Sequence, residues 1–261
     1  MSTTDDRILP FEAIENFRDY GDYALGGGGR LPRRKLLRSA HHGAATAADL
    51  AAMAELGVAT IVDLRRPMER DSNPSLRPPG FAGQVIECDL GDAAEAPHVA
   101  FLRETDLTAE SARAFFLNYY DKAPFEPRHE ILFRRYFEAL AEARGPILIH
   151  CTAGKDRTGL LAALTHHVAG VHADDARADY LLTNQAARLE ARMGPMTEAL
   201  EQNLGRRPSE EAVRLFLGVQ AEYLDAAMAS MAERCGGMDG YLDHIGVGAA
   251  LRDKVRAALA A

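Results

Sequence analysis

The sequence predicts an α/β fold, with a mostly parallel sheet flanked by helices and a helical C-terminal part. Short apolar runs at 58–64, 84–90 and 147–150 alternate with longer stretches whose apolar residues recur every three or four positions. This is the pattern of strands alternating with helices. From Thr158 onward the spacing is helical. With 261 residues, 47% of them hydrophobic, and no repeat or low-complexity linker, we expect one domain over 1–261 with a sizeable core.

The first elements surround a glycine-rich turn. Residues 20–38 are expected to form two short extended segments on either side of four glycines at 26–29, because glycine readily supplies the positive φ of a tight reversal. A basic cluster follows this turn and either attracts an anionic substrate or forms a solvated strand face, which is the interpretation we favour. It comprises Arg33, Arg34, Lys35 and Arg38.

The next elements are a helix and two strands. Thr46 is a candidate N-cap for an Ala-rich helix that Gly57 ends. The runs at 58–64 and 84–90 are expected to be strands. Between them, the proline-rich segment 72–80 is expected to be a loop, because proline cannot donate to a sheet ladder.

The second half begins with a polar stretch and two helical patterns, at 108–123 and 128–145. Gly145 and Pro146 end the second helix and begin the strand at 147–150. The helical tail is expected to break at glycines and prolines, namely Gly170, Gly194-Pro195, Pro208, Gly236-Gly237 and Gly246.

The segment 151–157 joins this last strand to a helix and is the chemical centre of the sequence. A strand, a short loop and a helix direct backbone N–H groups and the helix dipole at one point, so we expect an anion-binding cradle. The phosphate loop of nucleotide-binding proteins is excluded because Ile149 and Asp156 occupy the places of its first glycine and its Ser/Thr.

Cys151 opens this cradle and Arg157 closes it. Backbone dipoles, Lys155 and Arg157 favour the thiolate, so we expect Cys151 to be a nucleophile toward a bound phosphoryl group. The planar guanidinium of Arg157 can hold two phosphoryl oxygens at once. Thr158 is expected to cap the helix or donate to the sulfur, and His150 to fix the loop by a hydrogen bond. The alternative is that Cys151 is simply a small buried hydrophobe. The remaining loop residues are expected to contact the phosphoryl group: Thr152, Ala153 and Gly154.

Composition limits the other possibilities. A formal charge of -8 argues against nucleic-acid binding. Three cysteines without a C-x-x-C pair suggest neither a disulfide framework nor a structural zinc site, and the adjacent His166 and His167 point to different faces of a helix. The N-terminus does not resemble a signal peptide and no apolar stretch is long enough to cross a bilayer. We therefore expect a cytoplasmic protein without membrane insertion, metal or cofactor, and the sequence indicates no oligomeric state.

The loop HCTAGKDRTG (150–159) resembles the signature of cysteine-dependent protein tyrosine phosphatases, and more narrowly the bacterial branch that includes secreted mycobacterial tyrosine and lipid phosphatases. Other segments resemble motifs of that branch, with Asp22 and Gly237 standing where glycine and serine are usual. They are NFRDYGDY (16–23), LLRSA (36–40), VDLRRPMER (62–70) and GGMDGYLDHIGV (236–247). The resemblance implies the tyrosine-phosphatase fold, metal-independent phosphomonoester hydrolysis, and catalytic roles for Cys151, Lys155, Asp156 and Arg157.

The general acid is the least defined of these roles. The chain has no tryptophan, so it lacks the Trp-Pro-Asp loop of the best-known tyrosine phosphatases. The resemblance implies that Asp156 is the acid, whereas a purely structural Asp156 would pair with a neighbouring cation or cap the helix. Asp63 and Asp89 are competitors because each ends a predicted strand. Arg65 and Glu69 are expected to position substrate or to hold the loop.

Substrate class depends on the loop and on the tail. A second cation at Lys155 can neutralise an extra phosphate, so phosphotyrosine, phosphoserine or phosphothreonine, and phosphoinositides all remain candidates. Residues 184–234 contain amphipathic helices that either pack on the core or form a lid. Two other functions remain open: an inactive phosphate-recognition module, and a sulfur enzyme of the rhodanese or arsenate-reductase type.

Overall fold

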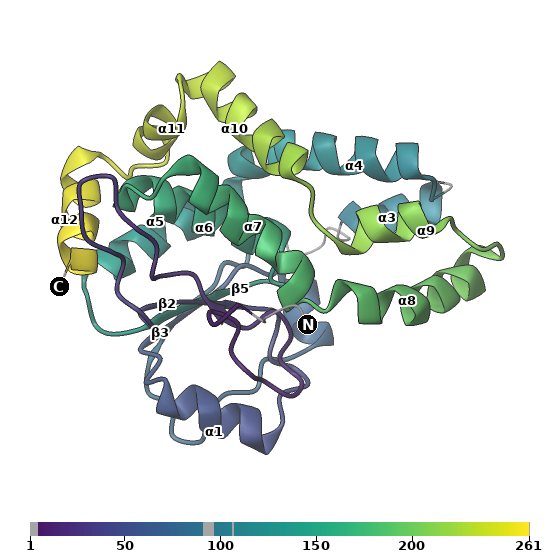
Figure 1. Cartoon of the computed structure of the whole chain (residues 1–261), viewed down its shortest axis with the longest axis horizontal. Helices are drawn as coiled ribbons and strands as arrows, with labels where there is room; N and C mark the ends of the chain where they lie inside the picture. Colours follow the sequence, from purple (N-terminus) through teal and green to yellow (C-terminus); the bar gives the residue numbers. More distant parts are fainter. Residues whose placement is uncertain (1–4, 91–96, 106, 261) are drawn as a thin grey trace.

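The computed structural model describes residues 5–90, 97–105 and 107–260. Within these residues, five strands form one sheet in the order β1-β2-β5-β3-β4 (Figure 1). The β1–β2 pair is antiparallel and every other pair is parallel, so the predicted α/β class is confirmed. The strands are β1 (Arg18–Asp19), β2 (Leu36–Ser39), β3 (Thr60–Asp63), β4 (Gln84–Ile86) and β5 (Ile147–His150).

Helices cover the sheet and extend beyond one end of it (Figure 1). The first six are α1 (Ala47–Glu55), α2 (Pro67–Ser72), α3 (Pro97–Glu104), α4 (Ala109–Lys122), α5 (Pro127–Ala141) and α6 (Asp156–Ala169). A 3₁₀ turn, η1 (Ala123–Phe125), joins α4 to α5. The remaining six are α7 (Ala173–Ala186), α8 (Leu189–Leu204), α9 (Glu210–Leu217), α10 (Ala221–Cys235), α11 (Met238–His244) and α12 (Ala249–Ala260).

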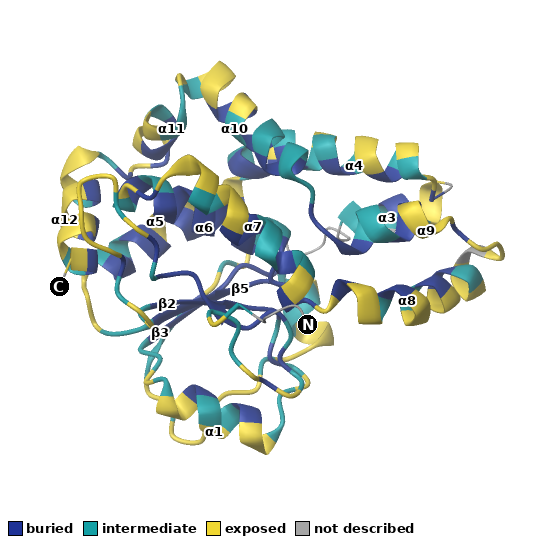
Figure 2. Ribbon diagram, viewed as in Figure 1, coloured by how far each residue is buried: buried dark blue, intermediate teal, exposed yellow. Residues whose placement is uncertain are grey.

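Both faces of the central strands are buried (Figure 2). In β5, Ile147 and Ile149 join the large core that includes α5 and α6, whereas Leu148 joins a smaller core with Met53 of α1. Because alternate residues of a strand point to opposite faces, a sheet covered on both sides needs continuous apolar runs. This explains the unbroken apolar character of the run at 147–150.

In the basic cluster after the glycine turn, the structure differs from the prediction at one residue, Arg38. Arg33 and Arg34 are exposed, as expected of a solvated face, but Arg38 in β2 is completely buried. Its guanidinium donates to Asp179 of α7 at 2.8 Å. The prediction of a solvated face was wrong for Arg38 because β2 lies inside the sheet, and a buried charge is tolerated only when it is paired.

Most predicted boundaries are close to those observed, and the exceptions have physical reasons. Thr46 caps α1 in a reciprocal capping box with Asp49. The strand predicted over 84–90 ends at Ile86. Pro195 does not break the tail but lies inside α8, where apolar packing by Met193 and its neighbours offsets the missing hydrogen bond.

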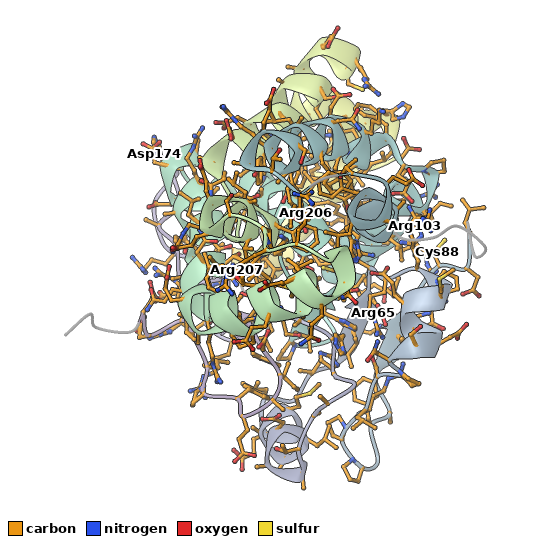
Figure 3. All side chains as sticks on the ribbon, turned by 90° about the vertical axis from the view of Figure 1, so that its right-hand side faces the viewer. Arg65, Cys88, Arg103, Asp174, Arg206 and Arg207 are labelled. Carbon is orange, nitrogen blue, oxygen red and sulfur yellow. The ribbon has the colours of Figure 1, made fainter. Side chains whose placement is uncertain are left out.

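A second apolar cluster joins α3, α4, α8 and α9 beside the sheet. Figure 3 views the molecule from this side, with Arg206 and Arg207 labelled between α8 and α9. From the sequence we expect only a polar stretch where α3 lies. Of the range 184–234, α8 and α9 belong to this cluster, whereas α10 packs along α4 and contributes Tyr223 to the main core. Within the described residues, we find no helix long and apolar enough to span a membrane.

Candidate active site

The predicted cradle lies at the carboxyl end of the central strand. In register, His150 of β5 lies between Ser39 of β2 and Asp63 of β3. The loop after His150 leads into α6, which begins at Asp156. Parallel strands and a helix N-terminus therefore converge at Cys151, the geometry that makes such an edge a binding site.

Gly154 gives the loop its shape. Its φ is +65°, and a Cβ atom at this position would lie 2.3 Å from the backbone oxygen of Ser39. No side chain fits there, and the left-handed conformation disfavours one in any case. The loop therefore turns against β2 at the one position where only glycine is possible.

Two side chains from the N-terminal segment hold the back of the loop. Asn16 Nδ2 donates to the carbonyl oxygens of Ala153 (3.1 Å) and Gly154 (2.7 Å). Arg38 also donates to Gly154 O, at 2.9 Å. These bonds turn the carbonyl groups away from the cavity, which leaves the loop N–H groups and the first turn of α6 to face an anion.

A cavity of about 430 Å³ opens above the loop. Cys151 lies on its floor with only 2% of its surface exposed. The other polar residues of the floor are Thr152, Lys155, Asp156 and Arg157. Apolar and aromatic side chains from α3, α4, α8 and α9 line the walls: Leu102, Phe115, Phe116, Tyr119, Met196, Leu200, Phe216 and Leu217.

Arg157 and Glu69 form a bidentate ion pair in this cavity. The two guanidinium nitrogens lie 2.6 and 2.7 Å from the carboxylate oxygens, and Thr152 Oγ1 donates to the same carboxylate at 2.5 Å. Burial disfavours both charges, but Arg157 holds the pKa of Glu69 well below its ordinary value and Glu69 raises the pKa of Arg157. Glu69 therefore fixes the plane of the Arg157 guanidinium beside the loop. This is the second of the two roles expected for Glu69, which were to position substrate or to hold the loop.

Replacing Glu69 by glutamine is expected to lower the free energy of unfolding by about 2 kcal/mol at pH 7, because Arg157 loses its charged partner. A carboxyl group whose pKa is depressed by folding stabilises the protein above its ordinary pKa, and this contribution is lost as pH falls toward the folded-state pKa. The difference between wild type and Glu69→Gln should therefore shrink below about pH 4.5. Urea unfolding of both proteins at neutral and acidic pH measures this difference in the free energy of unfolding.

The matched control is Glu222→Gln, which removes a carboxylate from an exposed pair with Arg113. We expect this control to change stability little at any pH, because exposed pairs contribute little. A Glu69→Gln effect that equals the control, or that stays constant as pH falls, would contradict the role assigned to Glu69.

Lys155 points across the cavity toward α9. Its ammonium donates to the carbonyl oxygens of Phe216 (2.6 Å) and Gly218 (3.1 Å) and lies over the Phe116 ring. Burial lowers the pKa of Lys155. The side chain thus ties the loop to the C-terminal end of α9, where helix carbonyl groups favour a cation.

Asp156 is the first residue of α6 and lines the cavity with Cys151. Tyr120 donates its hydroxyl to Asp156 Oδ1 at 2.8 Å, and Lys155 Nζ is 3.9 Å from Oδ2. The two competing carboxylates do not line the cavity. Asp63 is buried in a pair with Arg65, which also lies outside the cavity, and Asp89 is exposed and paired with Arg70.

Two further predicted residues, His150 and Thr158, flank the loop in sequence, are fully buried and do not line the cavity. His150 Nδ1 is 3.4 Å from Cys151 O and its other ring nitrogen is 3.5 Å from Asp63. Burial lowers the pKa of His150, which favours the neutral imidazole. The Thr158 hydroxyl is buried and, within the described residues, accepts and donates no hydrogen bond.

The roles that several residues play at the site were not predicted from the sequence, although Asn16 and Arg38 lie in two of the segments that resemble family motifs. Asn16 and Arg38 support the loop from far away in the sequence, and Tyr120 belongs to an ordinary amphipathic helix. His98 of α3 lines the cavity, and burial lowers its pKa. No group of three or more His, Cys, Asp or Glu residues suited to a metal ion occurs within 5–90, 97–105 and 107–260.

Comparison with known proteins finds one matching family and several relatives. A sequence profile described as the tyrosine phosphatase family matches residues 9–261. The chain is 34% identical over 234 residues (90% of its length and 82% of the relative's) to a Cupriavidus necator protein named among the tyrosine-protein phosphatases. It is 31% identical over a 272-residue alignment (94% of this chain and 96% of the relative) to the triple specificity protein phosphatase PtpB of Mycobacterium tuberculosis. A more distant likeness, at TM-score 0.32 and 19% identity over 75% of this chain and 87% of the other, is to TpbA of P. aeruginosa.

Proposed function

The chain belongs to the tyrosine phosphatase family, and on that premise we propose that it hydrolyses phosphotyrosine through a phosphocysteine intermediate on Cys151. One observation carries this proposal. Cys151, Asp156 and Arg157 share the floor of one cavity at the N-terminus of α6, beneath aromatic walls. On this proposal the three side chains act as nucleophile, acid and phosphate-binding cation on one phosphoryl group bound in the cavity.

The chemistry has two steps. The Cys151 thiolate attacks phosphorus, the bond from phosphorus to the phenolic oxygen breaks, and Asp156 donates a proton to that oxygen. Water then attacks the phosphocysteine and gives a proton to Asp156, the thiolate leaves, and inorganic phosphate is released. Arg157 and the loop N–H groups stabilise the charge on the phosphoryl oxygens in both steps.

A substrate panel in EDTA tests the proposal. We expect release of phosphate from a phosphotyrosine peptide, unaffected by EDTA, and a phosphoenzyme that can be trapped by acid quenching. A protein that binds the peptide without releasing phosphate would instead be a recognition module. Turnover that EDTA abolishes would exclude the cysteine mechanism.

The panel also includes phosphoserine and phosphothreonine peptides and phosphoinositides. We propose that the substrate range extends to these classes, and the support is that the mycobacterial relative is named a triple specificity protein phosphatase. The cavity continues beyond the loop between the apolar side chains of α8 and α9. We further propose that α8 and α9 form a lid that must open to admit a large substrate. Activity confined to small aryl phosphates would contradict both proposals.

Asp156 is proposed as the acid because it lines the cavity and its two competitors do not. Asp156→Asn is expected to lower the turnover of phenyl phosphate by about 10²-fold and to flatten the basic limb of its pH profile. Steady-state kinetics between pH 5 and 9 measure both effects. Unchanged turnover and pH dependence would move the role to another group.

A further inference from the structure

A chain of two buried tyrosine hydroxyls ends on the proposed acid. Tyr180 of α7 donates its hydroxyl to Tyr120 Oη at 2.8 Å, and Tyr120 of α4 donates to Asp156 Oδ1 at 2.8 Å. Both rings are buried, with 1% and 0% of their surface exposed. Because Tyr180 supplies its proton to the Tyr120 oxygen, the Tyr120 proton is directed to the carboxylate.

A glycine, Gly159, lies in α6 where the helix contacts the Tyr180 ring. A Cβ atom on Gly159 would lie 2.8 and 3.0 Å from two carbon atoms of the Tyr180 ring. Glycine weakens a helix interior by about 1 kcal/mol relative to alanine, so its place in the first turn of α6 has a structural reason. It lets the Tyr180 ring lie against the turn that carries Asp156.

Several titratable groups face Asp156 from the elements packed around it. They are His98 on α3, Tyr119 and Tyr120 on α4, Lys155 on the loop, Tyr180 on α7 and Tyr223 on α10. Among the described residues, Tyr120 is the one that hydrogen-bonds the carboxylate. Burial and the Asp156 charge raise the pKa values of Tyr120 and Tyr180 well above their ordinary range, so both hydroxyls stay protonated donors.

We propose that Tyr120 and Tyr180 are positioning residues, which hold Asp156 through the hydrogen bond to Oδ1 and leave Oδ2, 3.9 Å from Lys155 Nζ, to exchange a proton with the leaving group. This inference rests on the proposed function. In the first step the S–P bond forms, the bond to the leaving oxygen breaks, and the proton on Oδ2 passes to that oxygen. In the second step the proton of the attacking water passes to Oδ2. Tyr120 transfers no proton and keeps its O–H on Oδ1 throughout.

The test compares two leaving groups, because an acid matters most when the leaving group is basic. For Tyr120→Phe we expect kcat/KM to fall about tenfold on phenyl phosphate and to stay within about twofold on p-nitrophenyl phosphate. The basic limb of the phenyl phosphate profile should move to higher pH, because a carboxylate without its donor holds its proton more firmly. For Tyr180→Phe we expect the same pattern, reduced to about threefold.

Tyr136→Phe is the matched control. Tyr136 is also fully buried, and its hydroxyl contacts Tyr20 and Thr165 but not Asp156. The control should affect both substrates equally and leave the pH profile in place. The double variant Tyr120→Phe/Tyr180→Phe should behave as Tyr120→Phe alone, since both hydroxyls act through one bond to Asp156.

Each outcome decides the inference. Equal losses on both substrates, an unmoved pH limb, or additive effects in the double variant would overturn the positioning role while leaving the phosphatase proposal intact. If Tyr120→Phe does not fold, Tyr180→Phe decides by the same comparison. Absence of turnover in the wild type would instead contradict the proposed function itself.

Discussion

Cys151→Ser is expected to abolish phosphate release while leaving the fold and the binding of substrate intact. A serine hydroxyl remains protonated at neutral pH, and Asp156 cannot take its proton in the first step, because there Asp156 must itself be protonated to serve the leaving group. His150 does not line the cavity and offers no alternative base. Loss of a catalytic nucleophile reduces kcat by on the order of 10⁴-fold or more. The cavity itself changes by one atom, so the phosphoryl group still meets Arg157 and the loop.

The measurement pairs turnover with binding. Turnover of a phosphotyrosine peptide should fall to background. The dissociation constant of a non-hydrolysable analogue of that peptide should be the same for the variant and the wild type within about threefold. Cys88→Ser is the control, because Cys88 is half-buried and lies outside the cavity. Residual turnover above one part in about 10² would indicate that another group is the nucleophile.

The central part of the site was predictable from sequence because its information is local. The strand Ile147–His150, the turn at Gly154 and the start of α6 follow one another within a few residues. Each shows a different local signature, namely an apolar run, a glycine and a helical spacing. Local agreement of this kind predicts a structure without knowledge of its neighbours.

Arg38 shows why the rest could not be read from the sequence. Its partner Asp179 is 141 residues away, and its other partner is a loop carbonyl 116 residues away. A charged residue in a strand indicates a solvated face unless the other side of that strand is known to be covered. That knowledge comes only from the assembled sheet.

Lys155 illustrates the same limit within a correctly identified loop. The resemblance assigned its position, but the direction of its side chain depends on the carbonyl groups of Phe216 and Gly218, 61 and 63 residues further along. Its charge therefore stabilises the end of α9 in this structure, and a substrate phosphate would have to compete with two carbonyl oxygens for it. The short helix α3 was missed for a related reason, because Phe101 and Leu102 acquire their role only when α8 and α9 pack beside them.

Arg157→Lys is expected to lower kcat/KM for phosphotyrosine peptide by about 10²- to 10³-fold although the charge is conserved. In the structure, the guanidinium uses two nitrogens on one carboxylate, that of Glu69, and a third contact reaches Leu64 O at 3.2 Å. A lysine ammonium is a compact point charge and cannot hold two oxygens in one plane. Losing a single donor to the charge that develops in a transition state typically reduces the rate by 10²–10³-fold.

Two comparisons make this prediction specific to the shape of Arg157. Arg135→Lys changes an exposed arginine on α5 that donates to Glu87 O, and we expect kcat/KM to be unaffected. Glu69→Gln should lower kcat/KM less than Arg157→Lys, and the double variant should be no worse than Arg157→Lys, because Glu69 acts on the phosphoryl group only through the guanidinium that it orients. An Arg157→Lys variant within about twofold of the control would mean that charge alone suffices. If the losses in kcat/KM of the two single variants added up in the double variant, Glu69 would contact the substrate directly. A carboxylate can lie beside a phosphoryl group only when one of the two is protonated.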